Sequence, residues 1–163
     1  MPRSERVVRQ AEVAENDRLT LPGVVAGIAG GILIDLFLLG VYVWGEHLIA
    51  WQMLYQSIAS PLLGRSAFAG DTGVVAGIAI HAAISIAWGL GYAYVAGSTK
   101  QVLEHPFVSG LVFGIVVFVT MQIVEMSFGL WRPNLGNIET GLVAHVAFFG
   151  LPIAYIVNRW PRG

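Results

Sequence analysis

The hydrophobic positions of this chain fall into four long runs that more polar segments separate. The runs cover about residues 23–44, 73–96, 106–130 and 138–157. A helix rises about 1.5 Å per residue, so each run is long enough to cross a hydrocarbon layer of about 30 Å. The pattern predicts an all-α protein, a bundle of four transmembrane helices.

Small residues recur every fourth position within these runs. Residues four apart lie on one side of a helix, and small side chains allow two membrane helices to approach closely. We therefore expect the helices to pack through six glycines, Gly27, Gly31, Gly77, Gly110, Gly114 and Gly141.

The small-residue pattern also repeats between the two halves of the chain. The spacing from Gly77 to His81 in the second run recurs from Gly141 to His145 in the fourth. The first and third runs each hold two glycines four residues apart. Two explanations stay open: duplication of a helical hairpin, or the small-residue spacing that is common where membrane helices pack closely.

The connection between the first two runs, residues 45–72, has a helical pattern of its own. Its large apolar residues recur at helical spacing: Trp51, Leu54, Tyr55, Ile58 and Leu62. This predicts an amphipathic helix over about residues 46–60 that lies at the membrane interface or folds over the bundle, and that ends near Pro61 and Gly64. We expect Asp71 or Thr72 to cap the next helix, because a short side-chain oxygen can accept free N–H groups of the first turn.

Both ends of the chain are polar. Residues 1–20 hold four arginines and four acidic residues, which predicts a solvated tail with at most a short helix, and residues 159–163 form a second tail. Seven basic residues lie in the tails and the link between the second and third runs, whereas only Arg65 and Arg132 lie in the other links. Cytoplasmic loops carry the excess of Lys and Arg. We therefore expect both termini in the cytoplasm.

The tryptophans agree with this orientation, because tryptophan is enriched at both membrane interfaces. The orientation places Trp44, Trp51 and Trp131 at the outer interface and Trp160 at the inner one.

Composition supports a membrane protein and excludes several functions. The chain is 56% hydrophobic and only 12% charged, with a mean hydropathy of +0.70. A net charge of −1 without a basic patch argues against nucleic acid as a partner. The absence of cysteine excludes disulfides and thiolate ligands or nucleophiles. We expect membrane lipid as a partner, together with a homo-oligomer or a larger membrane complex.

Four ionisable residues lie well inside the apolar runs, Asp35, His81, Glu125 and His145, and Gln122 lies one turn from Glu125. Ionisable groups in a bilayer are expensive, so each calls for a partner or a function. Counted from the outer ends of the runs, the four ionisable residues lie about 8 to 14 Å deep. We therefore expect them to form one intramembrane polar layer that points inward.

Several roles for this layer stay open. It can be a structural network that fixes helix register, a proton or transport path, or a haem site with His81 and His145 as ligands. A metal centre of two histidines and two carboxylates is a further alternative, although no HxxxH or ExxH pair lies on one helix. We expect the structural role, and hence a non-catalytic packing or accessory protein without a metal or cofactor; a small transporter or proton conductor is the alternative.

Several segments carry a family resemblance: YQSIASPLLGRSAFAG, GIAIHAAISIAWGLGYAY, HPFVSGLVFGIVV and HVAFFGLPIA. Together they resemble a group of small uncharacterised bacterial four-helix membrane proteins, loosely YagU-like, over roughly residues 20–158. The resemblance implies four spans in the bacterial inner membrane, and it brings no activity or catalytic residue. This chain departs from the group near Glu125, where the resemblance leads us to expect an apolar stretch.

Overall fold

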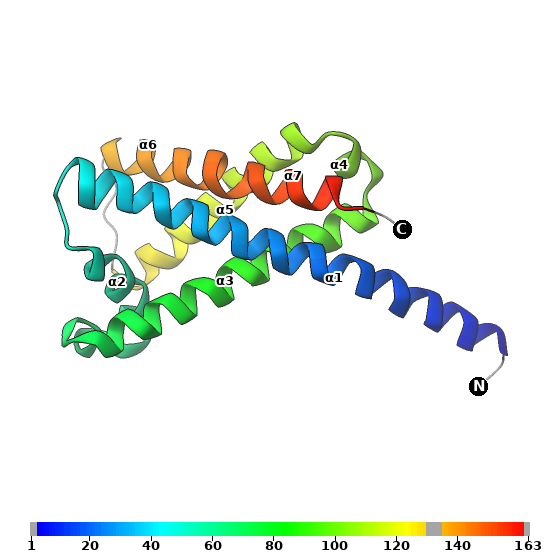
Figure 1. The fold of residues 1–163 in the computed structure, drawn as a ribbon, viewed down its shortest axis with the longest axis horizontal. Coiled ribbons are helices and arrows are strands. Elements are labelled where there is room, and N and C mark those ends of the chain that lie inside the picture. The colour runs from blue at the N-terminus through cyan, green and yellow to red at the C-terminus, as the bar shows by residue number, and fades with distance from the viewer. Residues whose placement is uncertain (1–2, 130–134, 162–163) are drawn as a thin grey trace.

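The computed structural model describes residues 3–129 and 135–161, and the side chains of residues 5, 19–129 and 138–161. This part of the chain is helical, without strands (Figure 1). The elements are α1 (Arg3–Leu38), η1 (Leu39–Gly45), α2 (Trp51–Leu63), η2 (Gly64–Phe68), α3 (Asp71–Ser98), α4 (Lys100–Glu104), α5 (Pro106–Ser127), α6 (Leu135–Val143), η3 (Ala144–Gly150) and α7 (Leu151–Arg159).

Four of the described helical stretches are long and apolar enough to cross a membrane. They cover Leu19–Gly45, Asp71–Ser98, Pro106–Ser127 and Ile138–Arg159, close to the four predicted runs. The third ends at Ser127, ahead of the predicted end, and residue 130 lies outside the described part. The first span closes with the π-helical turn η1, and the fourth joins α6 to α7 through the π-helical turn η3.

The N-terminal segment differs from its prediction. We expected a polar tail with at most a short helix, but α1 begins at Arg3 and continues through Pro22 into the first span. The four arginines and three glutamates of residues 1–20 favour helix, and a helix already formed in the span propagates at little further cost. Figure 1 shows this part of α1 extending beyond the other helices.

The connection between the first two spans contains the predicted helix, α2. It ends at Leu63, where Gly64 has a φ of 58°, so the predicted end near Pro61 and Gly64 is close. The predicted cap of α3 is wrong. Gly70, with a φ of 105°, holds the N-cap position, and Asp71 is already the first helical residue, without a capping side-chain hydrogen bond. This backbone conformation suits glycine, so the chain enters the helix one residue earlier.

Two glycines of α3 receive the α2 segment. A Cβ on Gly77 would overlap the backbone of Tyr55, and a Cβ on Gly73 would overlap that of Ala67. We expected Gly77 to face another span; it faces the backbone of α2 instead. The absence of a side chain on these two residues is therefore what allows α2 and η2 to lie directly against α3.

The spans pack in two pairs, and in both pairs a glycine lies against a carbonyl oxygen and the next Cα atom of the facing helix. Between α1 and α3, a Cβ on Gly27 would lie 2.5 Å from the Ser85 carbonyl oxygen and 2.7 Å from Ile86 Cα. Between α5 and η3, a Cβ on Gly114 would lie 2.7 Å from both the His145 carbonyl oxygen and Val146 Cα. Both pairs bring helix backbones into direct contact.

The same correspondence holds one turn further along each pair. A Cβ on Gly89 would collide with the Gly23 carbonyl oxygen, and one on Gly150 would lie 2.5 Å from the Gly110 carbonyl oxygen. In α3, Gly89 follows Ser85 by four residues, and in the π-helical turn η3, Gly150 follows His145 by five. Because a π-helical turn aligns residues five apart, Gly89 and Gly150 occupy equivalent positions in the two pairs. The two pairs of spans thus pack in the same way. This packing aligns Ser85 with His145, whereas the spacings from Gly77 and Gly141 align His81, one turn earlier, with His145.

The buried core lies between α1, α3, α5 and the fourth span, and aromatic rings connect these helices. Phe113 contacts the rings of Tyr92 at 4.9 Å, Trp88 at 6.0 Å and Phe149 at 6.5 Å between centroids. The fully buried residues around them are Ala26, Ala96, Val117, Ala144, Ile153, Ala154 and Val157. Pairs of aromatic rings add roughly 0.5–1.5 kcal/mol each beyond the area they bury.

The glycine contacts generate a first prediction. Gly89→Ala should lower the free energy of unfolding by about 1–3 kcal/mol, because the new methyl group would force α1 and α3 apart. Gly91→Ala lies on the same helix, and nothing lies within 4 Å of its Cβ position. This control should be neutral or stabilising by up to about 1 kcal/mol. Thermal unfolding of both variants in detergent measures the difference, and equal melting temperatures would contradict the packing described.

Candidate functional site

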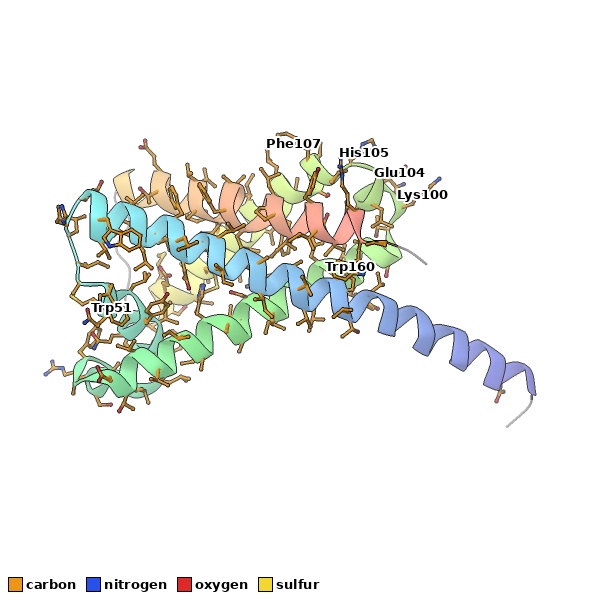
Figure 2. The ribbon with its side chains drawn as sticks, viewed as in Figure 1. Trp51, Lys100, Glu104, His105, Phe107 and Trp160 are labelled. Atoms are coloured by element: carbon orange, nitrogen blue, oxygen red, sulfur yellow. The ribbon has the colours of Figure 1, made fainter. Side chains whose placement is uncertain are left out.

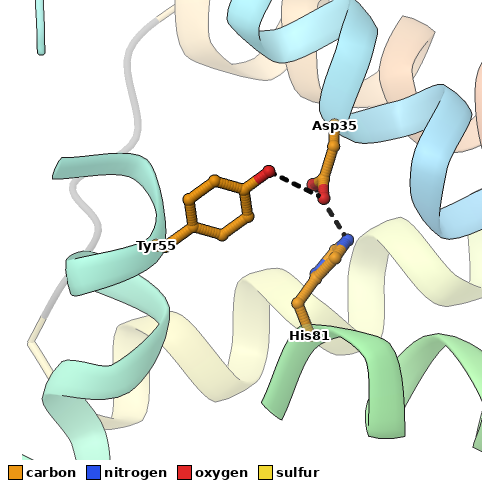
Figure 3. A network of polar contacts seen from close by, with 3 residues as sticks. All are labelled: Asp35, Tyr55 and His81. Atoms are coloured by element: carbon orange, nitrogen blue, oxygen red, sulfur yellow. Dashed lines mark hydrogen bonds and ion pairs between the residues drawn. The ribbon is translucent and has the colours of Figure 1, made fainter. Parts of the chain in front are cut away.

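Three polar side chains from three different helices meet at the α2 end of the molecule (Figure 3). His81 Nε2 of α3 faces Asp35 Oδ1 of α1 at 3.0 Å, and the Tyr55 hydroxyl of α2 donates to Asp35 Oδ2 at 3.2 Å. Asp35 thus holds one partner on each carboxylate oxygen. We refer to Asp35, Tyr55 and His81 as the carboxylate triad.

The triad is largely shielded from solvent. The Asp35 and His81 side chains are 18% and 20% exposed, and the two facing atoms are themselves buried. Apart from their mutual contact, these two atoms have no polar partner among the described residues. Burial, followed by the negative charge of Asp35, raises the pKa of the Tyr55 phenol to about 12, so Tyr55 stays protonated and able to donate at physiological pH.

Close helix packing explains why Asp35 and His81 can meet. Gly31 lies one turn before Asp35, and a Cβ there would lie 2.9 Å from Ser85 Oγ and 4.0 Å from His81 Nε2. A larger side chain would push α3 away from α1. Together with Gly27, this glycine sets the separation at which a carboxylate and an imidazole reach each other.

Tyr55 was not among the predicted site residues. Its spacing assigns it to the apolar stripe of the connecting helix, and its hydroxyl meets a residue 20 positions earlier in the chain. The one usable signal was its phenol, because a buried Tyr hydroxyl usually has a hydrogen-bond partner. The sequence did not indicate which partner.

His145 has a different environment from His81. Its Nδ1 lies 2.8 Å from the Gly141 carbonyl oxygen on the same helix, and its ring lies 5.7 Å from that of Phe118. A carbonyl oxygen only accepts, so Nδ1 carries the proton in this contact. His145 and His81 lie close enough to interact electrostatically, but the structure shows no hydrogen bond between them.

The other two predicted members of the polar layer stay apart from the triad. Gln122 Oε1 is buried and has no hydrogen-bond partner within the described part of the chain. Its amide nitrogen lies 3.5 Å from the position of a Cβ on Gly141. Glu125 interacts electrostatically with Tyr42, which in turn hydrogen-bonds Thr140. The predicted single layer is therefore divided into the triad and separate groups on α5 and the fourth span.

A second polar network, which the sequence did not predict, lies at the opposite end. The Tyr92 hydroxyl donates to Asn158 Oδ1 at 3.2 Å and lies 2.7 Å from Ser109 Oγ. Asn158 Nδ2 donates to the carbonyl oxygens of Val102 and Leu103 at 2.7 and 3.2 Å. This network ties α3, α5 and α7 to the short helix α4 and satisfies backbone groups that the helix end leaves free.

Comparisons with known proteins give no match among protein-family models, curated proteins or solved structures. The resemblance to YagU-like proteins therefore stays a prediction. Within residues 3–129 and 135–161, no three His, Asp or Glu residues gather closely enough to hold a metal ion.

The triad generates a second prediction. His81→Ala should lower the free energy of unfolding by about 1–3 kcal/mol, because Asp35 keeps only one partner in a buried position. His81→Gln keeps a donor and should be less destabilising. Thermal unfolding in detergent compares the two, and unchanged stability in both would contradict a structural role for this contact.

A third prediction concerns Tyr55. Tyr55→Phe removes the hydroxyl that reaches Asp35 while keeping the ring, so it should destabilise the protein by roughly 0.5–1.5 kcal/mol. Tyr94→Phe is the matched control, because it makes the same chemical change at a tyrosine of α3 whose side chain is 67% exposed. The same unfolding measurement applies, and an equal loss in the control would show that the effect does not depend on the contact with Asp35.

Proposed function

We propose that this protein is a non-catalytic, multi-pass membrane protein that acts through helix packing, as an oligomer or as an accessory subunit of a larger complex. The main support for the proposal is that the polar groups of the protein contact one another across helices. Asp35, His81 and Tyr55 bind one another across three helices, and the network around Asn158 ties the opposite helix ends together. Such contacts between helices favour a scaffold with a fixed register.

The outer surface supports the same proposal. Large apolar side chains are exposed on all four spans, and examples are Leu21, Ile32, Val75, Val95, Val112, Ile123, Val143 and Tyr155. Soluble proteins rarely expose apolar surface that is so continuous. Membrane lipid and the helices of partner subunits are the environments that would cover it.

We further propose a four-span bundle in the bacterial inner membrane with both termini in the cytoplasm. Figure 1 places both chain ends at one end of the molecule and α2 at the other. Trp51 lies at the α2 end, whereas the opposite end carries Lys100, Glu104, His105, Phe107 and Trp160 (Figure 2). Trp131 and Arg132, which the sequence assigns to the outer side, lie outside the described residues.

The orientation gives a fourth prediction, which single cysteines can test in this cysteine-free chain. Glu46→Cys, in the exposed link before α2, should react with a membrane-impermeant maleimide on intact cells. Lys100→Cys, whose side chain is 84% exposed in the wild type, should react only after the cells are opened. The reverse pattern would overturn the orientation but not the four spans.

The function itself is tested by the state of the protein in its membrane. Native mass spectrometry of the protein released from native membranes should give a homo-oligomer or a stoichiometric complex. A monomer alone, in lipid and at native expression levels, would contradict the packing role.

A second candidate function is proton conduction, and the triad favours it specifically. Carboxylate and imidazole side chains can each carry a proton, and the buried atoms Asp35 Oδ1 and His81 Nε2 have no polar partner except each other among the described residues. Chains of Asp, Glu and His inside a membrane are the groups that proton relays use. Gln122 and His145 would extend the path beyond the triad.

Proteoliposomes distinguish the two candidates. With a pH-sensitive dye inside and a potassium diffusion potential, the conductor should acidify or alkalinise the lumen, and Asp35→Asn and His81→Gln should each abolish this flux. The packing protein should show no flux above that of empty liposomes. A visible absorption spectrum of the same sample tests the haem alternative, because axial ligation by His81 and His145 would give a Soret band.

A further inference from the structure

The face of α2 that contacts the rest of the protein is its polar one. Gln56 and Ser60 are each only 8% exposed, and Ala59 between them is fully buried. Gln56 Nε2 donates to the Gly70 carbonyl oxygen at 3.2 Å, and the Tyr55 hydroxyl donates to Asp35. Gln56 and Tyr55 therefore reach partners in the rest of the protein, while the buried Ser60 hydroxyl donates to the Ser57 carbonyl oxygen at 2.8 Å within the helix.

The outward face of α2 is apolar. Trp51 is 48% exposed, Met53 42%, Leu62 74% and Leu63 37%. Ser57 is the exposed polar residue among them, and its hydroxyl donates to the Met53 carbonyl oxygen at 2.7 Å, within the helix. From residue 48 to residue 64 the chain carries no charged side chain.

This arrangement is the reverse of that of a helix lying on a membrane surface. Such a helix turns its polar face to water and its apolar face to the acyl chains. An α2 covered by water on its outer side would expose Leu62 and Trp51 to it while burying Gln56 and Ser60. The observed arrangement suits an outer side without water.

We propose that α2 is embedded in the hydrocarbon of the leaflet at its end of the molecule, with lipid acyl chains against its outward face. The inference rests on the proposed membrane-spanning arrangement and deepens it. With 13 residues, α2 is about 20 Å long and too short to span the bilayer. The chain therefore enters the leaflet after the first span, forms α2 there, and returns through η2, which contains Arg65, to the start of α3.

Two observations favour lipid over a second copy of the chain as the occupant. Exposed apolar side chains also flank α2, with Trp44 and Leu48 before it and Phe68 after it, and such side chains recur on the exposed faces of the spans. The outward face also consists of large side chains. The glycines that permit close helix contact on α3, Gly73 and Gly77, are already occupied by this chain's own backbone.

An embedded α2 also changes the environment of the triad. Tyr55 approaches Asp35 from the side of α2, so a phenol occupies a position on the carboxylate that water could otherwise take. With lipid beyond α2, this side of the triad is sealed from bulk water. Proton exchange with Asp35 would then require movement of α2.

Spin labels on single cysteines test the inference in lipid vesicles of phosphatidylcholine and phosphatidylglycerol. Labels at Met53→Cys and Leu62→Cys should collide with oxygen, which partitions into lipid, severalfold more often than with a water-soluble nickel chelate. Val116→Cys, on the exposed face of α5, is the lipid reference, and Lys100→Cys is the aqueous one.

The outcomes separate the inference from the proposed function. If the α2 labels match the label at residue 100 while the label at 116 reports lipid, α2 lies in water and the inference fails alone. If the label at 116 also reports water, the membrane-spanning arrangement fails. Low collision rates for both reagents, with spin–spin broadening between labels at residue 62, would mean that a second copy covers α2 and would overturn lipid as the occupant.

Trp51 supplies a second measurement without a label on α2. In a variant whose other four tryptophans are replaced by Phe, brominated phosphatidylcholine should quench Trp51 fluorescence more strongly than aqueous iodide does. Quenching by iodide with no effect of the brominated lipid would overturn the inference, even if the cysteine variants failed to fold.

Discussion

The direct contact of helix backbones at glycine is the constraint on which the rest of this structure depends. Gly27 and Gly31 remove the side chains that would separate α1 from α3; the backbone of Ser85 and Ile86 occupies the space at Gly27, and the Ser85 side chain occupies the space at Gly31. At this separation the carboxylate of Asp35 and the ring of His81, one turn further along, face each other at 3.0 Å. The polar contact is therefore a consequence of the apolar packing. Helix association inside a membrane relies on such packing because no hydrophobic force acts between helices there.

The second pair of spans repeats the packing but not the polar chemistry. Counted from the aligned glycines Gly27 and Gly114, Asp35 corresponds to Gln122, and the position of His81 corresponds to Gly141. A glycine offers no ring, so Gln122 faces no side-chain partner there, in accord with its unpaired amide oxygen. The two halves thus share a way of packing, while the contact between Asp35 and His81 in the first pair of spans has no counterpart at Gln122 and Gly141 in the second. The π-helical turn η3 keeps Gly150 in register in the second half.

The helix α2 links the Asp35–His81 pair to the exposed apolar surface of the protein. Its inward face contributes Tyr55 to the carboxylate of Asp35, and its outward face is as apolar as the surface of the spans. A short helix can combine polar contacts on its inner side with an apolar outer side only if its polar face, with Gln56 and Ser60, packs against the protein. The carboxylate triad and the proposed position of α2 in the leaflet are therefore two aspects of one arrangement.

The sequence by itself determined the helical class, the four long apolar stretches and the presence of a helix before the second span, because hydrophobic periodicity and length act locally along the chain. It also identified Asp35 and His81 as residues that need a partner, since burying a charge is costly wherever the fold places it. It did not reveal Tyr55 as that partner, the division of Gln122, Glu125 and His145 from the triad, or the network around Asn158. Those depend on which helix faces which and at what rotation and register. The tertiary structure decided them, because glycine positions allow several pairings and only the packing of the whole chain selects one.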